Sequence, residues 1–280
     1  MTRSTFAAPR RRLAALSLLA VFGASVFGPA APAAIAADLP VDAATLNAQE
    51  AQMLSFLNAD RAEVGLVPVR VDSRLMAIAR ARSADMIAKD YFSHTQPDGR
   101  NVFDIIAASG IAWYGAGEII AWNNYPMDVT ASTANHQWMN SPGHHAIVVS
   151  ADFNYVGVGL VVDGTTGKKM WTAVYMKGPD RTGARASIAR PSLGGGTITT
   201  RRVTLSWTGS DVRLQVLTAG LGSFVLQRKV DGGRWRTITT TTSRYRRLSV
   251  LKGHVTQFRV AARDRAGNRG AWSTTTVNLR

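Results

Sequence analysis

Two histidines and one glutamate of this chain have side chains suited to chemistry, and each stands in or beside a regular element. His94 follows a helical stretch, Glu118 lies in an apolar run over residues 117–121, and His144 follows the helix breaker Ser141-Pro142-Gly143. Imidazole and carboxylate groups bind divalent metals and transfer protons near neutral pH. A fold that brings the three together would therefore create a site for a metal ion or for proton transfer.

The residues alone leave several roles open. Two neutral imidazoles with water or a carboxylate suit zinc, at roughly 2.0–2.2 Å per bond, so His94 and His144 are candidate ligands for zinc or another divalent ion. Glu118 could bind the metal, orient an imidazole, or be protonated as a candidate base with a raised pKa. The purely structural alternatives are a helix cap for His94, a surface charge on an edge strand for Glu118, and a contact with a broken helix end for His144.

Hydrophobic periodicity predicts the elements that must position these side chains. Helical patterns run from Leu46 to Gly65, from Asp72 or Ser73 to about Lys89, over 102–106, and over 127–140. Buried-strand patterns cover 114–122, 155–162 and 169–177, and a turn signature over 163–167 joins the last two. We expect an α+β domain over residues 46–178.

The residue pattern changes after this domain. Residues 179–196 contain Pro191 and a Gly-Gly-Gly run without an apolar period, which predicts a linker. Short β patterns follow over 203–207, 223–230, 235–240 and 256–263. Their spacing predicts a small all-β antiparallel sandwich over residues 197–280.

The N-terminal segment is typical of a secretory signal peptide, which we place at residues 1–37. Three arginines precede the apolar run 13–27, and small residues follow it. Sec and twin-arginine export both stay open. No later segment has the length and apolarity of a membrane span, which takes around 20 residues. We expect a secreted or envelope-associated protein without a transmembrane span in its mature chain.

The absence of cysteine excludes some functions, and the distribution of charge favours certain partners. The chain has no cysteine, which excludes a thiol nucleophile, a thiolate metal site and disulfides. Residues 38–180 carry 10 basic and 15 acidic side chains, whereas residues 181–280 carry 19 basic and 3 acidic ones. The positive field of the C-terminal part favours anionic partners such as wall polymers or lipid headgroups, although solubility alone is an alternative explanation. No nucleic-acid-binding motif accompanies the basic run 244–247.

Several motifs in order resemble the CAP superfamily (cysteine-rich secretory, antigen 5 and pathogenesis-related 1 proteins; SCP domain) in its bacterial form. These motifs are Leu57-Asn58-x-x-Arg61, Gly65-Leu66-x-Pro68, residues 79–86, Ser93-His94, Gly117-Glu118, Trp138-x-x-Ser141-Pro142-Gly143-His144 and residues 156–159. The resemblance implies a three-layer α-β-α sandwich with a cleft lined by His94, Glu118 and His144.

The chain also departs from that family pattern. Ser141 stands where many members have a second acid, and Ile119 where many have an asparagine. A site with two histidines and two acids is therefore not supported. Residues 197–280 resemble a fibronectin type III module through Leu205-Ser206-Trp207, residues 258–264 and Gly267-Asn268, but Thr256 replaces its usual core tyrosine.

Three functions follow as hypotheses. The first is a secreted CAP-domain protein that binds an extracellular lipid, glycan or peptide, with a divalent metal as an option, and that a basic β-sandwich holds near an anionic envelope. The second is an extracellular hydrolase of peptides or wall material, with Glu118 or a histidine as base and a metal-bound water as nucleophile. The third is an adhesion module with a vestigial cleft. No serine-nucleophile signature such as Gly-x-Ser-x-Gly is present, so we assign no catalytic residue.

Overall fold

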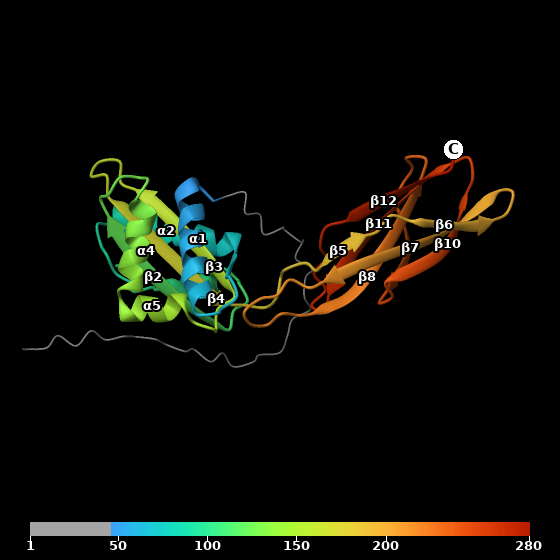
Figure 1. The fold of residues 1–280 in the computed structure, drawn as a ribbon. Helices are drawn as coiled ribbons and strands as arrows, with labels where there is room; N and C mark the ends of the chain where they lie inside the picture. Colours follow the sequence, from blue (N-terminus) through green and yellow to red (C-terminus); the bar gives the residue numbers. More distant parts are fainter. Residues whose placement is uncertain (1–45) are drawn as a thin grey trace, which may run out of the picture.

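A computed structural model describes residues 46–280 of the chain, and they form two parts that follow one another along the molecule (Figure 1). The predicted signal peptide, residues 1–37, lies outside the described residues. Within residues 46–280 no helix has both the length and the apolarity needed to cross a membrane.

The N-terminal part, residues 46–178, combines five helices with a four-stranded sheet. The helices are α1 (Ala48–Glu63), α2 (Ser73–Ala88), α3 (Val102–Ala108), α4 (Thr130–Met139) and α5 (Pro142–Val148). The strands are β1 (Arg70–Val71), β2 (Gly115–Asn123), β3 (Tyr155–Val162) and β4 (Lys169–Lys177), in the order β1-β3-β4-β2. The β3–β4 hairpin has the predicted bounds, whereas α4 begins three residues after the predicted start at 127.

Local capping explains where the helices begin. Asn47 and Glu50 form a reciprocal capping box at α1, and the Asp72 side chain accepts a hydrogen bond from the Arg74 amide at α2. These bonds satisfy amide groups that the first helical turn leaves without partners. Of the two predicted starts of the second helix, Asp72 and Ser73, Asp72 is the N-cap and Ser73 is the first helical residue.

Helices cover both faces of the sheet (Figure 1). Because side chains alternate along a strand, Ile119 and Ala121 of β2 pack in one cluster with residues of α1 and α4, such as Met53 and Trp138. Ile120 lies in a separate cluster with Met86 of α2. Glu118 shares the face of Ile120, so β2 directs this carboxylate toward α2.

Two glycines of β3 let α2 approach the sheet closely. A Cβ atom at Gly157 would lie 2.1 Å from the backbone carbon of Leu75, and one at Gly159 would lie 2.3 Å from the backbone nitrogen of Arg80. The helix backbone therefore rests directly on these two residues, which fixes the height of α2 above the sheet.

The C-terminal part, residues 179–280, consists of two four-stranded sheets that share one buried apolar cluster. One sheet has the order β10-β7-β5, with β6 also paired to β7, and the other has the order β12-β11-β8-β9. The strands are β5 (Arg185–Ile188), β6 (Ser192–Gly196), β7 (Thr200–Ser210), β8 (Leu221–Val230), β9 (Arg236–Thr241), β10 (Tyr245–Leu251), β11 (Val255–Asp264) and β12 (Ser273–Asn278).

Half of the predicted linker over residues 179–196 is strand. Residues 185–188 and 192–196 pair with β7 as β5 and β6. The composition was misleading because main-chain pairing, not side-chain burial, holds the Gly-Gly-Gly segment, whose residues are all exposed. Because residues 185–196 already contribute two strands to the C-terminal part, the segment that connects the two parts is short.

The loop between β7 and β8 fastens the two parts to each other. Leu214 of this loop is 2% exposed and packs in the α2–α3 core cluster. The side chain of Gln215 accepts a hydrogen bond from the Val67 amide at 2.7 Å, and the Val216 carbonyl accepts one from Asn154. Apolar burial and specific hydrogen bonds therefore both hold the junction.

Candidate ligand-binding cleft

The fold brings His94, Glu118 and His144 together from three different elements. Nδ1 of His94 lies 2.8 Å from Oε2 of Glu118. The rings of His94 and His144 lie with their centroids 6.3 Å apart and are inclined by 54°. The purely structural roles considered for the two histidines do not apply. The C-cap of α2 is Lys89 rather than His94, and His144 lies inside α5 rather than at the end of α4.

Glu118 is buried although it lies on an edge strand of the sheet. The residue is 6% exposed, so its alternative role as a solvated surface charge is wrong. Its buried charge is balanced by Arg82 of α2, whose Nε donates to Oε1 of Glu118 at 2.8 Å. A buried carboxylate needs such a partner, since an isolated charge in an apolar interior is strongly disfavoured.

Arg82 also holds the segment that carries His94. Its terminal nitrogens donate to the Ser93 carbonyl at 2.8 Å, to the His94 carbonyl at 3.2 Å and to the Tyr91 hydroxyl at 2.7 Å. One guanidinium thus positions both the carboxylate and the backbone of the histidine that contacts it. Its planar fork of donors allows this in a way that a lysine cannot match.

The bond to Glu118 determines which nitrogen of His94 can meet a ligand. An ionised carboxylate only accepts hydrogen bonds, so Nδ1 of His94 carries the proton and donates it to Glu118. Nε2 remains the nitrogen that can bind a metal ion or a ligand atom. Burial, and secondarily the neighbouring His94, lowers the pKa of His144, which keeps that imidazole neutral at pH 7.

Two imidazoles, of which Glu118 orients one, are ligands of the type that zinc accepts. Both Glu118 oxygens already face Arg82 or His94. Among residues 46–280, His94, Glu118 and His144 do not place three ligating atoms within 4.8 Å of one another. These contacts favour the predicted role of Glu118 in orienting an imidazole over direct metal binding.

A groove of 470 Å³ opens beside His144. Aromatic side chains form much of its wall: Phe92, Trp122 and Tyr125 are each more than 40% exposed. The wall also includes Trp138, which is fully buried and whose Nε1 has no hydrogen-bond partner in the protein. Aromatic surface with a few polar groups is the usual lining of a small-molecule site.

The site thus contains residues that sequence reasoning missed. Arg82 was part of a family-like motif, but nothing in its spacing identified its contact with Glu118, 36 residues away in sequence. Trp122 and Tyr125 line the groove, whereas the nearby aromatic residues Trp113 and Tyr114 are not among its lining residues.

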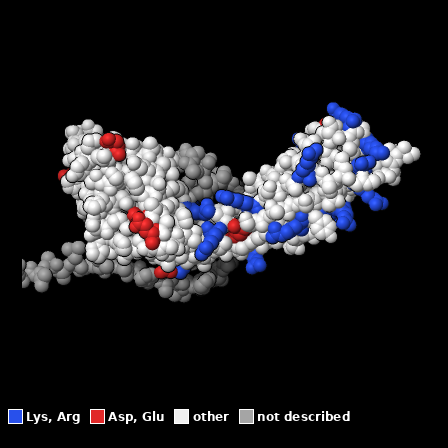
Figure 2. Space-filling model, viewed as in Figure 1, with Lys and Arg blue, Asp and Glu red and all other residues white. Residues whose placement is uncertain are grey.

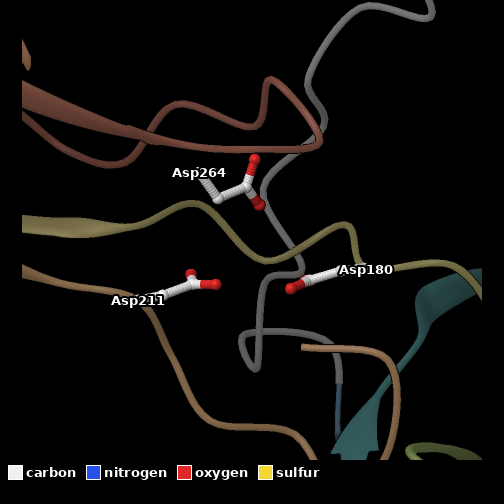
Figure 3. A group of neighbouring side chains, drawn as sticks. All are labelled: Asp180, Asp211 and Asp264. Atoms are coloured by element: carbon white, nitrogen blue, oxygen red, sulfur yellow. The ribbon is translucent and has the colours of Figure 1, made fainter. Parts of the chain in front are cut away.

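A cluster of three acidic side chains, separate from the cleft, lies at the junction of the two parts. Asp180, Asp211 and Asp264 place carboxylate oxygens within 4.8 Å of one another (Figure 3). Each already accepts hydrogen bonds from a nearby turn: Asp180 from the Thr182 and Ala219 amides, and Asp211 from the Val212 and Gly220 amides. Asp264 binds Asn268, whose side chain also donates to the Asp180 carbonyl. The three carboxylates thus organise the turns at the junction.

Residues 46–178 thus combine a mixed sheet and its helices with a buried carboxylate and two imidazoles beside an aromatic groove. Residues 54–175 match the family model described as CAP, the cysteine-rich secretory protein family. The chain therefore contains a CAP domain over these residues.

Two proteins of Bacillus subtilis are similar to this chain. An uncharacterized protein, YkwD, is 35% identical over 133 residues, which cover 47% of this chain and 48% of YkwD. An uncharacterized membrane protein, YlbC, is 31% identical over 111 residues, which cover 40% of this chain and 31% of YlbC. The chain thus spans about half or less of the length of these relatives.

Solved structures also resemble the CAP domain. An outer surface protein of Borrelia burgdorferi is 17% identical, with 46% of this chain and 92% of that chain covered and a TM-score of 0.42. An extracellular protein of Bacillus anthracis that contains an SCP domain is 25% identical, with 47% and 44% covered and a TM-score of 0.40.

Proposed function

We propose that the CAP domain binds an extracellular lipid, glycan or peptide in the aromatic groove, with an oxygen or nitrogen atom of the ligand placed against the two imidazoles. The observation that carries this proposal is that His144 belongs both to the histidine–glutamate cluster and to the wall of the groove.

The C-terminal part would hold the protein near an anionic envelope. Its fold supports a fibronectin type III-like sandwich, and the 19 basic against 3 acidic side chains of residues 181–280 support an electrostatic attraction to such a surface. Secretion, which the N-terminal sequence predicts, would place both parts outside the cell.

The groove is tested by calorimetric titration of residues 38–280 with muropeptides, a short-chain phospholipid and a peptide mixture. We expect binding of one class, and we expect Trp122→Ala to weaken it about tenfold, because an exposed aromatic wall is lost. Tyr114→Ala is the matched control: this residue is also exposed and flanks the opposite end of β2, but does not line the groove. Equal losses in both variants, or no binding by the wild type, would contradict the proposal.

A hydrolase is the second candidate function, since the His94–Glu118 pair has the geometry of a histidine oriented by a carboxylate. Product analysis of the same mixtures distinguishes the two functions. Turnover that Glu118→Gln abolishes without loss of binding would establish the hydrolase. Binding without products would support the binding protein.

A metal ion at the cleft would be held by His94 and His144, and would polarise an oxygen atom of the bound ligand. We expect zinc at ten times its Kd to stabilise residues 38–280 by about 1.4 kcal/mol, seen as a higher melting temperature. His94→Ala with His144→Ala should abolish the shift. His136→Ala with His145→Ala removes the same number of imidazoles and should retain it. A wild type that zinc does not stabilise would show that the cleft works without metal.

A further inference from the structure

A row of alternating cations and indole rings crosses one sheet of the C-terminal part. Arg259 of β11 lies between two tryptophans, with its guanidinium carbon 4.3 Å from the Trp235 ring and 4.2 Å from the Trp272 ring. Lys229 of β8 lies 4.9 Å from the Trp235 ring, and Arg269 lies 4.9 Å from the Trp272 ring. We call these five residues the cation–tryptophan row.

The row runs across the strands rather than along one of them. Lys229 and Arg259 belong to the paired strands β8 and β11, while Trp235 directly precedes β9 and Trp272 directly precedes β12. Two members therefore lie on paired strands, and the other three, Trp235, Arg269 and Trp272, lie in the segments that precede β9 and β12. All five residues keep part of their surface exposed to solvent.

The cations of the row lack acidic partners. Among the described residues, no carboxylate lies within 4.0 Å of the charged nitrogens of Lys229, Arg259 or Arg269. The hydrogen bond of Arg259 is from Nε to the neutral side chain of Gln227, at 2.8 Å. Partial burial, and secondarily the neighbouring Arg269, lowers the pKa of Arg259. An anion at this place would relieve the repulsion between the cations.

The stacking also determines how Arg259 can bind. Two indole rings lie 4.3 and 4.2 Å from the carbon of its guanidinium, and its Nε donates to Gln227, so the terminal nitrogens remain for a ligand. The N–H groups of a guanidinium lie in one plane and match two oxygens of a phosphate group. The tryptophans thus hold the arginine in a binding orientation before any ligand arrives, which lowers the entropy cost of binding.

The chemistry of the surroundings favours a polymer over a membrane. Neighbouring cations are separated by an indole ring, so a ligand with repeated charges can reach several of them at once. Around the row the same sheet face carries the polar side chains Gln227, Thr237, Thr274 and Gln257, and the two indole rings lie against cations. Basic side chains outnumber acidic ones over the visible face of this part (Figure 2).

We propose that the cation–tryptophan row is a binding site for a linear phosphate polymer. This proposal rests on the envelope attachment proposed above, and it assigns that attachment to a defined site rather than to a diffuse positive surface. It also differs from the basic run 244–247 noted in the sequence, most of which belongs to β10 in the other sheet. Ligand binding in the CAP groove does not depend on it.

The experiment measures binding of fluorescently labelled inorganic polyphosphate to residues 38–280 at several salt concentrations. Lys229→Gln with Arg269→Gln removes both ends of the row and leaves the stacked centre in place. We expect this variant to bind about tenfold more weakly at 0.1 M salt, with the slope of log Kd against log salt reduced by about two. Arg246→Gln with Arg247→Gln removes the same charge from the other sheet and should change Kd less than threefold. Unchanged melting temperatures verify that both variants fold.

Each of the following outcomes would contradict one part of the proposal. Equal weakening by the two double variants would mean that diffuse charge binds the polymer, so the row would fail while the envelope attachment stands. Absence of polyphosphate binding by the wild type would overturn both. Tighter binding to phosphatidylglycerol vesicles, or to single-stranded DNA, than to polyphosphate would replace the phosphate polymer with a membrane or a nucleic acid as the partner.

Discussion

Gly157→Ala is expected to unfold the CAP domain or to destabilise it by more than about 4 kcal/mol. The added methyl group would stand 2.1 Å from the Leu75 carbonyl carbon and 2.3 Å from the Met76 nitrogen, and both are backbone atoms of α2. Backbone cannot move aside as a flexible side chain can, so the helix would have to lift from the sheet. Circular dichroism during thermal unfolding measures the loss.

Gly164→Ala is the control for this substitution. Gly164 lies in the turn of the same β3–β4 hairpin, and a Cβ atom there would meet nothing within 4 Å. We expect this change to leave the free energy of unfolding within about 0.5 kcal/mol of wild type. A Gly157→Ala protein that unfolds at the temperature of the control would mean that α2 does not pack against β3 as closely as the structure places it.

Gly157 and Gly159 of β3 also illustrate what the sequence could predict about the fold. The buried-strand pattern over residues 155–162, next to a turn signature, identified β3 as a strand, and its Val-Gly-Val-Gly run was one of the motifs that resembled a CAP domain. Local pattern is enough for this, because a short apolar run that ends at a turn signature is a property of the segment itself. That α2 rests on the glycines depends on a contact between distant segments, which no local pattern encodes.

The same distinction between local pattern and contacts of distant segments applies to the candidate site. His94, Glu118 and His144 could be named from the sequence because their residue types and motif positions are distinctive. Their division of roles could not, since it depends on Arg82 approaching Glu118 from another element and on the resulting orientation of His94. The strands β5 and β6 escaped prediction for a related reason: their pairing with β7 uses main-chain bonds that composition does not reveal.

Arg82→Ala should destabilise the CAP domain by about 3–5 kcal/mol, because it leaves the Glu118 carboxylate buried without a counter-ion. The two side chains are only 1% and 2% exposed, so water cannot take the place of the guanidinium. The variant also loses the bonds to the Ser93 and His94 carbonyls, which hold the segment that carries His94. Denaturant titration measures the stability, and the NMR signals of the His94 ring should broaden or shift.

Two further variants separate the buried charge from other effects of the mutation. Arg74→Met removes an arginine from the same helix, but its partner Asp72 keeps a second contact with Arg181, so we expect a loss below about 1 kcal/mol. Arg82→Met combined with Glu118→Leu removes both buried charges and should recover much of the stability, while His94 loses the carboxylate that orients it. Stability regained without the His94 signals of the wild type would show that the ion pair positions the cleft. A double variant no more stable than Arg82→Ala would instead assign the loss to packing around the arginine stem.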